Sequence, residues 1–260
     1  DPDESEFSAL LRAIAAEVQG LRRLRYESPH PRHLTASLIA AHRDLEVLPR
    51  HVHMPVQSGA DRVLKRMVRR HTRAEYLERL ERLRAEVPGL TVSTDVIVGF
   101  PGESEEDFEA TLSLLEVLRP AGVFGFMYSP RPHTPALKLC DDVSAAVKSE
   151  RLARLFELSE RLLGEHLASL VGGRELVLVE GPSKYRPENL SGRSGRSEIV
   201  HIEGAADLDL VGELVEVEVV EAYKHSLLAR LTEEARAGAR RLGVPVLERR
   251  SLPLVNGGRA

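Results

Sequence analysis

Over the first two thirds of the chain, segments with helical periodicity alternate with short apolar segments, and this alternation constrains the fold more than any other feature. The first helical segment starts at Phe7, and the last one ends near Val171. Strands are expected between them over residues 21–26, 51–57, 91–100 and 123–128. Regular alternation indicates parallel βα units with right-handed connections. The sequence therefore predicts an α/β fold, part of a barrel or a doubly wound sheet, with functional groups at the C-terminal strand ends.

Local signals support several of these elements. Thr72-x-x-Glu75 and Ser104-x-x-Asp107 each place a hydroxyl residue three positions before an acid, which is the pattern of a helix capping box. A further helix is expected over residues 35–45, and a long one over residues 144–170. The apolar run at residues 96–98 predicts a strand that is covered on both faces.

The pattern changes at Gly172-Gly173 and becomes rich in strands. Segments 174–180, 198–202, 213–220 and 226–231 are separated by Gly, Pro, Ser and Asn, which is typical of a small antiparallel barrel of the OB type. The Arg-rich remainder has little apolar periodicity, so we expect it to be weakly ordered. We therefore predict three parts: residues 1–171, residues 172–232 and a tail at residues 233–260.

The composition excludes several classes of protein. Cys140 is the only cysteine, which rules out an intrachain disulfide and any cluster or zinc site built from cysteines of this chain alone. No apolar run approaches the roughly 20 residues that cross a bilayer, and residues 1–7 are acidic, so we expect a cytoplasmic protein. The net charge of −4 gives no general attraction to nucleic acid, so RNA binding would require local basic patches.

Three expected strand ends carry unusual polar or glycine-rich sequences: residues 53–59, 95–103 and 128–132. Parallel strands bring these ends to one rim, where glycines allow a ligand to approach the backbone and polar side chains can bond its hydroxyl or amine groups. The alternative is that the glycines only form turns. The candidate cofactor-binding residues are Gln57, Ser58, Gly59, Asp95, Ile97, Gly99, Tyr128 and Ser129.

Two stretches are candidates for contact with the phosphates of a nucleic acid. Residues 62–73 contain six Lys or Arg and no acid, and a second group of basic residues lies in the expected small barrel. Solvated surface charge is the alternative for both. The candidate RNA-binding residues are Arg66, Arg69, Arg70, Arg131, Lys184, Arg186, Arg193 and Arg196.

Four histidines invite a metal assignment, namely His30, His33, His51 and His53. No carboxylate or cysteine stands at a recognised metal spacing from them, so we predict no metal site. His53 is a candidate rim residue instead.

Five stretches together resemble the methylthiotransferase family of radical S-adenosylmethionine (SAM) enzymes. They are Ser28-Pro29-His30-Pro31, His53-Met54-Pro55-Val56-Gln57-Ser58-Gly59-Ala60-Asp61, Ser93-Thr94-Asp95-Val96-Ile97-Val98-Gly99-Phe100-Pro101-Gly102-Glu103, Tyr128-Ser129-Pro130-Arg131-Pro132 and Val179-Glu180-Gly181-Pro182-Ser183-Lys184. The last two are similar to the tRNA-modifying, MiaB-type branch. The branch that modifies a ribosomal protein tends to carry acidic residues in the first of these two.

The resemblance implies a partial radical SAM core followed by an RNA-binding TRAM barrel. It implies S-adenosylmethionine and [4Fe–4S] clusters as cofactors, the anticodon stem-loop of tRNA as partner, and addition of a methylthio group to N6-isopentenyladenosine beside the anticodon. The cofactors carry such chemistry while the protein supplies orientation.

The chain departs from the family pattern because it contains none of the expected cysteine triads. We therefore interpret it as a fragment, a chain with a misassigned start, or one half of a split enzyme whose partner chain supplies the rest, and expect the isolated chain to be inactive. One alternative is a non-catalytic RNA-binding remnant, and another is a ribosomal-protein methylthiotransferase. A metal-independent barrel enzyme would need a complete set of strands, whereas about four core strands are expected.

Overall fold

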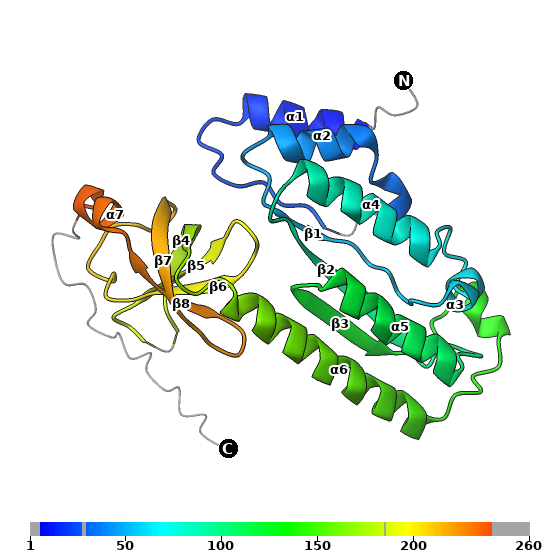
Figure 1. Cartoon of the computed structure of the whole chain (residues 1–260). Coiled ribbons are helices and arrows are strands. Elements are labelled where there is room, and N and C mark those ends of the chain that lie inside the picture. Colours follow the sequence, from blue (N-terminus) through cyan, green and yellow to red (C-terminus); the bar gives the residue numbers. More distant parts are fainter. Residues whose placement is uncertain (1–5, 28–29, 185, 241–260) are drawn as a thin grey trace, which may run out of the picture.

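The computed structural model describes residues 6–27, 30–184 and 186–240, which form an α/β region joined by a long helix to a closed barrel (Figure 1). The α/β region contains a parallel sheet with strand order β1-β2-β3. These strands are β1 (His51–His53), β2 (Thr91–Val98) and β3 (Gly122–Met127). The sequence predicts four core strands, and the described residues contain three.

The segment at residues 21–26 was expected to be the fourth strand, and this prediction is wrong. It has no regular secondary structure and pairs with no strand, and Leu24 N–H donates to the Val47 carbonyl at 2.8 Å. Its arginines point to the barrel instead: Arg23 Nη1 donates to the carbonyl oxygens of Arg193 and Ser194 at 2.7 and 2.9 Å. The alternation of Leu and Arg here therefore belongs to a connection between the two regions.

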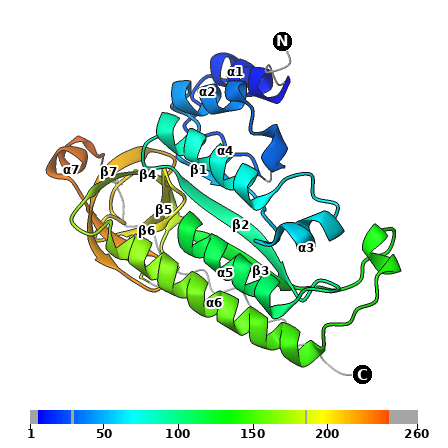
Figure 2. The same cartoon turned by 45° about the vertical axis from the view of Figure 1, so that its right-hand side comes forward.

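Helices cover one face of the sheet (Figure 2). They are α4 (Arg73–Glu86), α5 (Glu105–Leu118) and α6 (Ala145–Ala168), and both expected capping boxes are present at Thr72 and Ser104. Helix α2 (Ala36–Asp44) packs beside α4, and α1 (Glu6–Glu17) packs on α2. Helix α3 (Asp61–Arg66) and the 3-10 turns η1 (Pro31–His33) and η2 (Pro135–Lys138) occupy loops. Among the described residues no helix combines the length and the apolarity needed to cross a bilayer.

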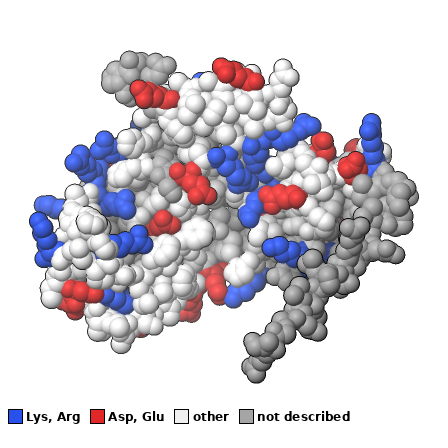
Figure 3. Space-filling model, turned by 180° about the vertical axis from the view of Figure 1, so that it is seen from behind, with Lys and Arg blue, Asp and Glu red and all other residues white. Residues whose placement is uncertain are grey.

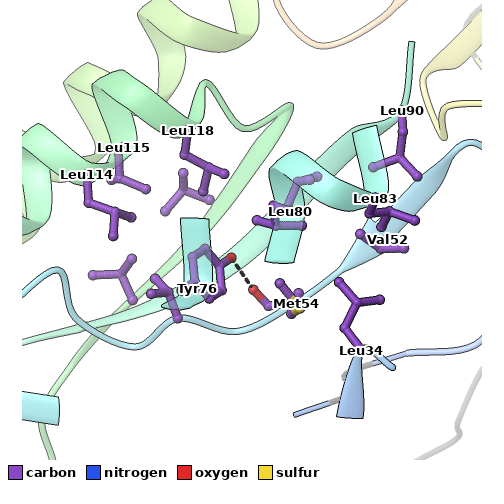
Figure 4. Packing of buried hydrophobic residues seen from close by; sticks show 14 of the residues in the cluster. Leu34, Val52, Met54, Tyr76, Leu80, Leu83, Leu90, Leu114, Leu115 and Leu118 are labelled. Carbon is purple, nitrogen blue, oxygen red and sulfur yellow. Dashed lines mark hydrogen bonds between the residues drawn. The ribbon is translucent and has the colours of Figure 1, made fainter. Parts of the chain in front are cut away.

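The core between helices and sheet is apolar and closely packed (Figure 4). Tyr76, from α4, is fully buried and donates its hydroxyl to the Met54 carbonyl oxygen at 2.7 Å. This bond satisfies a backbone oxygen just past the end of β1, where the short strand leaves it without a ladder partner. The core thus fixes the loop that follows β1.

The opposite face of the sheet is partly open. Asp95 and Ile97 on β2 are half-buried, and their β3 neighbours Phe124 and Phe126 are 54% and 50% exposed. The continuous apolar run predicts coverage of both faces, and in the described structure this second face is not fully covered. The side chains that β2 presents to it are therefore accessible.

The C-terminal region is a closed five-stranded barrel with strand order β4-β5-β6-β8-β7. Its strands are β4 (Arg174–Pro182), β5 (Leu190–Ser194), β6 (Ile199–Ile202), β7 (Leu214–Ala222) and β8 (Leu227–Leu231). Two features differ from expectation: β5 was not predicted, and β6 pairs with β8 in parallel, so the barrel is mixed. The expected weakly ordered tail begins with a helix, α7 (Glu233–Gly238), and residues 241–260 lie outside the described residues.

Candidate functional site

A cavity of about 500 Å³ opens at the C-terminal ends of β2 and β3, where the sequence predicts a rim. Five of the expected cofactor-binding residues contribute to its wall: Gln57, Asp95, Ile97, Tyr128 and Ser129. Three expected RNA-binding arginines join them: Arg66, Arg69 and Arg131. The remaining wall consists of residues that were not among the named candidates: Met67, Val68, Phe100, Phe126, Met127, Thr134, Pro135 and Ala136. Mixed apolar and convergent polar groups are typical of a small-molecule site.

Gln57 is fixed to β2 by its backbone. Its N–H donates to the Asp95 carbonyl and its own carbonyl accepts from Ile97 N–H, both at 2.9 Å. The residue has a φ of +74°, a left-handed conformation that a non-glycine residue rarely adopts. Such strain persists only where surrounding contacts enforce it, and it is frequent at ligand sites.

The acidic wall of the cavity is Asp95. Its Oδ1 lies 3.3 Å from His53 Nε2, and its side chain is 26% exposed. Arg69 faces the same carboxylate; burial lowers the pKa of this arginine, and the charge of Asp95 opposes that shift. Asp95 therefore combines a charged partner with access to the cavity.

The aromatic wall is held by a cluster beneath it. The rings of Phe100 and Tyr128 pack edge to face with centroids 5.1 Å apart. Lys148 Nζ lies 5.2 Å from the centroid of the Tyr128 ring and bonds both Asp141 oxygens at 2.6 and 2.7 Å. The sequence did not indicate Lys148, because 20 residues separate it from Tyr128 and a buried lysine in an amphipathic helix resembles a surface one.

A second buried ion pair supports the loop after β2. Arg151 Nη1 lies 2.9 Å from a Glu103 carboxylate oxygen, and the two side chains are 5% and 1% exposed. Glu103 also accepts from Gly99 N–H at 2.6 Å. Burial raises the pKa of Glu103, while these bonds from Gly99 and Arg151 oppose that shift. The acid that ends the glycine-rich motif thus orders the loop rather than facing the cavity.

Three expected cofactor-binding residues lie outside the cavity wall. Ser58 is fully buried, and Gly59 N–H donates to Thr111 Oγ1 at 2.9 Å. A Cβ on Gly59 would lie 2.4 Å from the Ala110 carbonyl oxygen, and one on Gly99 would lie 2.3 Å from Lys148 Cγ. The structure therefore gives these glycines a packing role: they let helices α5 and α6 approach the strand-end loops.

The basic stretch at residues 62–73 is partly used in packing. Arg62 pairs with Asp107, and Arg73 Nη1 donates to the Ala110 carbonyl oxygen at 2.7 Å. Arg66 Nε donates to the Pro101 carbonyl oxygen at 3.0 Å, while Arg70 is exposed. Only some of the basic residues in this stretch therefore face the cavity or the solvent, and the others pair within the fold.

The four expected barrel cations do not form one patch. Lys184 and Arg186 are exposed in the loop before β5, whereas Arg193 and Arg196 lie at the far end of this strand. Five residues of strand span roughly 16 Å, so the two pairs are well separated. Arg196 is paired with Glu175 and only 21% exposed, and Arg193 Nε lies 3.5 Å from a Glu180 oxygen. Basic and acidic side chains are interspersed on the face that Figure 3 shows.

No metal site is present among the described residues, where no three His, Cys, Asp or Glu side chains are placed to hold an ion. Cys140, the only cysteine in the sequence, is exposed in a loop. A [4Fe–4S] cluster needs several thiolates, so the residues of this chain do not fit one.

Comparison with known proteins agrees with this architecture. The model of the radical SAM superfamily matches residues 1–115, and the TRAM domain model matches residues 168–232. The chain is 64% identical over 265 aligned residues to a tRNA-2-methylthio-N(6)-dimethylallyladenosine synthase of Sorangium cellulosum. The alignment covers 98% of this chain and 53% of that relative. A protein of the same name from Geobacter sulfurreducens is 47% identical over 89% of this chain and 51% of the relative.

Among solved structures, coproporphyrinogen III oxidase of Escherichia coli, a radical SAM enzyme, matches with a TM-score of 0.48 and 20% identity, over 61% of this chain and 37% of that one. At this similarity the match bears on no residue of the site.

The chain therefore contains part of a radical SAM domain and a TRAM domain. The first is the parallel α/β region with the cavity at its strand ends, and the second is the closed barrel. Over most of its length the chain is similar to one half of proteins named as MiaB-type tRNA methylthiotransferases. It spans about half the length of the curated relatives that it matches.

Proposed function

We propose that this chain supplies the S-adenosylmethionine-binding wall and the RNA-binding barrel of a tRNA methylthiotransferase that acts beside the anticodon. The observation that carries the proposal is one cavity that combines Asp95, Gln57 and Tyr128 with arginines. The 64% identity to a relative named for 2-methylthio-N(6)-dimethylallyladenosine synthesis supports the same reaction.

The wall offers groups that suit this ligand. The Asp95 carboxylate can accept hydrogen bonds from ribose hydroxyls or an ammonium group, and Phe126 and Tyr128 offer apolar surface to an adenine ring. Arg66 and Arg131 at the same cavity can neutralise RNA phosphates. Bound S-adenosylmethionine supplies the reactive sulfonium group, while these residues orient it.

Titration of the chain with S-adenosylhomocysteine tests the cofactor part. Asp95→Asn removes the charge but keeps the shape, and we expect the Kd to rise roughly tenfold because a charge-assisted hydrogen bond is lost. Asp207→Asn, on the exposed surface of the barrel, is the control and leaves the Kd unchanged. Equal Kd values for wild type and Asp95→Asn would remove the cavity from cofactor binding.

Filter binding of an anticodon stem-loop over a range of salt concentrations tests the RNA part. Each phosphate contact contributes a slope of roughly −0.7 to −0.9 to log affinity against log salt. The sequence predicts that the pair Arg193 and Arg196 contributes; the ion pairs of these residues favour Lys184 and Arg186 as the larger contributors. Replacing Lys184 and Arg186 with Ala should flatten the slope by up to about two units, and an unchanged slope would exclude the loop.

A second candidate function, RNA binding without catalysis by the isolated chain, is supported by its single cysteine. Anaerobic reconstitution with iron and sulfide should yield no stable [4Fe–4S] cluster, because one thiolate cannot replace three. A stoichiometric cluster signal from this chain alone would contradict that. In the first proposal a separate segment or partner chain provides these ligands, and adding such a chain should restore the signal.

A further inference from the structure

Two histidines that do not line the cavity, His30 and His33, belong to a group of basic side chains beside it. The ring centroids of these two histidines are 6.1 Å apart, and that of His30 lies 5.4 Å from the centroid of the buried His71 ring. Burial is the main cause that lowers the pKa of His30 to about 4, and four basic neighbours lower it further: His71, Arg69, His33 and Arg32. We refer to His30, Arg32, His33 and Arg69 as the basic cluster.

The two arginines of the basic cluster have no partner for their guanidinium groups. Among the described residues, neither Arg32 nor Arg69 donates a side-chain hydrogen bond or forms an ion pair. Arg32 is exposed, whereas Arg69 is half-buried, so that its guanidinium has lost part of its hydration without gaining a hydrogen bond in the protein. An anion bound beside Arg69 would supply the missing charge-assisted hydrogen bonds.

A strained turn holds Arg69 in place. Helix α3 ends in the bonds of a Schellman motif, in which Val68 N–H donates to the Lys65 carbonyl at 3.1 Å and Arg69 N–H to that of Leu64 at 2.9 Å. This motif usually has glycine at its left-handed position, but here the position is occupied by Val68, with a φ of +59°. A β-branched residue rarely adopts this conformation, and such strain is frequent at ligand sites. From this turn Arg69 reaches the cavity wall.

His30 is held so that one ring nitrogen is free for a ligand. Its Nδ1 accepts a hydrogen bond from Arg32 N–H at 3.2 Å, as the N-cap of η1. The proton of the neutral ring is therefore on Nε2, which has no partner among the described residues and can donate. Pro31 is buried, and its carbonyl oxygen accepts from Arg79 Nη1 at 3.0 Å. The loop is thus anchored before any ligand binds.

We propose that the basic cluster binds one phosphate group, the phosphodiester next to the nucleotide whose base enters the cavity. Arg32 and Arg69 neutralise its charge, and His30 Nε2 donates a hydrogen bond to one of its oxygens. An enzyme that modifies a base takes it out of the stack, which brings the flanking phosphates to the entrance of the cavity. Arg69 belongs to the cavity wall and to the basic cluster, so the two sites are adjacent. The assignment of the phosphate to RNA rests on the proposed function.

Titration of the full chain with inorganic phosphate at pH 7, followed by nitrogen-15 NMR of its imidazoles, tests the site without RNA. We expect the His30 signals to shift and saturate while those of His166, at the far end of α6, stay unchanged. Potassium chloride at equal ionic strength is the control for screening. Absence of a saturable shift, or the same shift in chloride, would show that the basic cluster is only solvated and would overturn the proposal.

A matched pair of charge variants follows from the same titration. Arg32→Ala should raise the Kd for inorganic phosphate at least about fivefold, because one charge-assisted hydrogen bond is lost. Arg161→Ala, on α6 at the helix-covered face, changes the net charge equally and should leave this Kd unchanged. Equal Kd values for the two variants would contradict a local site.

Two substitutions of His30 separate its donor from its role in the loop. His30→Asn keeps an acceptor near the position of Nδ1, and so keeps the N-cap of η1, but lacks the Nε2 donor. His30→Gln keeps a donor near the position of Nε2. We expect His30→Asn to raise the Kd for an anticodon stem-loop roughly tenfold and His30→Gln to raise it less than about threefold. The reverse order would show that His30 only shapes the loop.

Filter binding of the stem-loop at several salt concentrations identifies the source of the phosphate. Arg32→Ala should flatten the slope of log affinity against log salt by roughly 0.7–0.9, whereas His30→Asn should leave the slope unchanged because a neutral ring releases no counterion. Saturable binding of inorganic phosphate with an unchanged slope in Arg32→Ala would refute the assignment to RNA. If inorganic phosphate binds at His30 and the wild type does not bind the stem-loop, the proposed function fails and the phosphate site stands.

Discussion

The sheet and the barrel differ in how they use their two faces. The sheet buries one face under helices and leaves the other partly open, so that polar and aromatic side chains of β2 and β3 reach the cavity directly. The barrel closes on an apolar interior in which Val177, Val200 and Val217 are fully buried. Its exposed cations Lys184 and Arg186 lie in the loop before β5. An open sheet can thus place ligand groups on its strands, whereas a small filled barrel presents them from loops.

Loss of the buried ion pair beside the cavity should change the stability of the two regions most unequally. Arg151→Met leaves the Glu103 carboxylate buried without its cation, and we expect the α/β region to lose about 3–5 kcal/mol of unfolding free energy. The barrel should unfold at an unchanged denaturant concentration. Urea titration followed by region-specific probes measures both transitions.

The double variant Arg151→Met with Glu103→Gln is the control, since it removes both charges and should recover part of the loss.

We also predict that residues 173–231 form a separable domain, so that limited proteolysis cuts near Gly172. If Arg151→Met destabilises both regions equally, they unfold as one unit and this prediction is wrong.

Two glycines allow a matched test at a smaller scale. A Cβ at Gly59 would meet the Ala110 carbonyl oxygen at 2.4 Å, and one at Gly192, on β5, would meet that of Leu178 at 2.2 Å. Gly59→Ala should destabilise the α/β region, and Gly192→Ala the barrel, each by about 1–3 kcal/mol. Thermal melts should show each change confined to its own region, and Gly195→Ala, where nothing lies within 4 Å, is the control.

The contact between the regions should respond to pH. Burial raises the pKa of Glu198, but hydrogen bonds from His166 and Ser194 outweigh burial and hold it below its usual value. Because the pKa of Glu198 is lower in the folded chain than in the unfolded chain, where it is about 4.5, its ionised form stabilises the fold fully at pH values above 4.5. This stabilisation is lost as the pH falls from 4.5 through the pKa of the folded chain. Glu198→Gln should therefore cost on the order of 1 kcal/mol at pH 7 and less at pH 3. Equal costs at the two pH values would exclude this ionised contact.

The smallest expected change is stabilising. Gly164 lies within helix α6 with no atom near the position of a Cβ. Gly164→Ala should raise the unfolding free energy by about 0.5–1 kcal/mol, because alanine has less backbone entropy to lose. A fall in the melting temperature would show that α6 needs to bend at this position.

The sequence predicts those elements whose stability is local. The capping boxes at Thr72 and Ser104, the long helix α6 and the strands β2 and β3 all carry signals within their own residues. β5, with the sequence LSGRS, does not, and its ladders with β4 and β6 determine its conformation. Residues 21–26 show the opposite case: their sequence has the pattern of a strand, but no neighbouring strand pairs with them and they form a connection instead.

The candidate site was predictable to a similar degree. Strand ends indicated Asp95 and Tyr128 for one rim, and both line the same cavity because parallel topology brings such positions together. Glycine close to a ligand and glycine close to a helix give the same sequence signal, so Gly59 and Gly99 could not be distinguished from cavity residues. Lys148 contacts the site only through the tertiary packing of α6, which no local pattern records.

Helix α6 gives the molecule a fixed internal length. Its 24 residues span roughly 36 Å, with Lys148 in the first turns beneath the cavity and His166 near the end bonded to Glu198 of the barrel at 2.7 Å. An RNA that contacts the cavity and the barrel at once would therefore be gauged by this helix. One inserted residue would turn the barrel by about 100° relative to the cavity, whereas four would restore its orientation within about 40° and move it about 6 Å further away. The spacing between the cavity and the barrel is thus set in steps of whole helical turns.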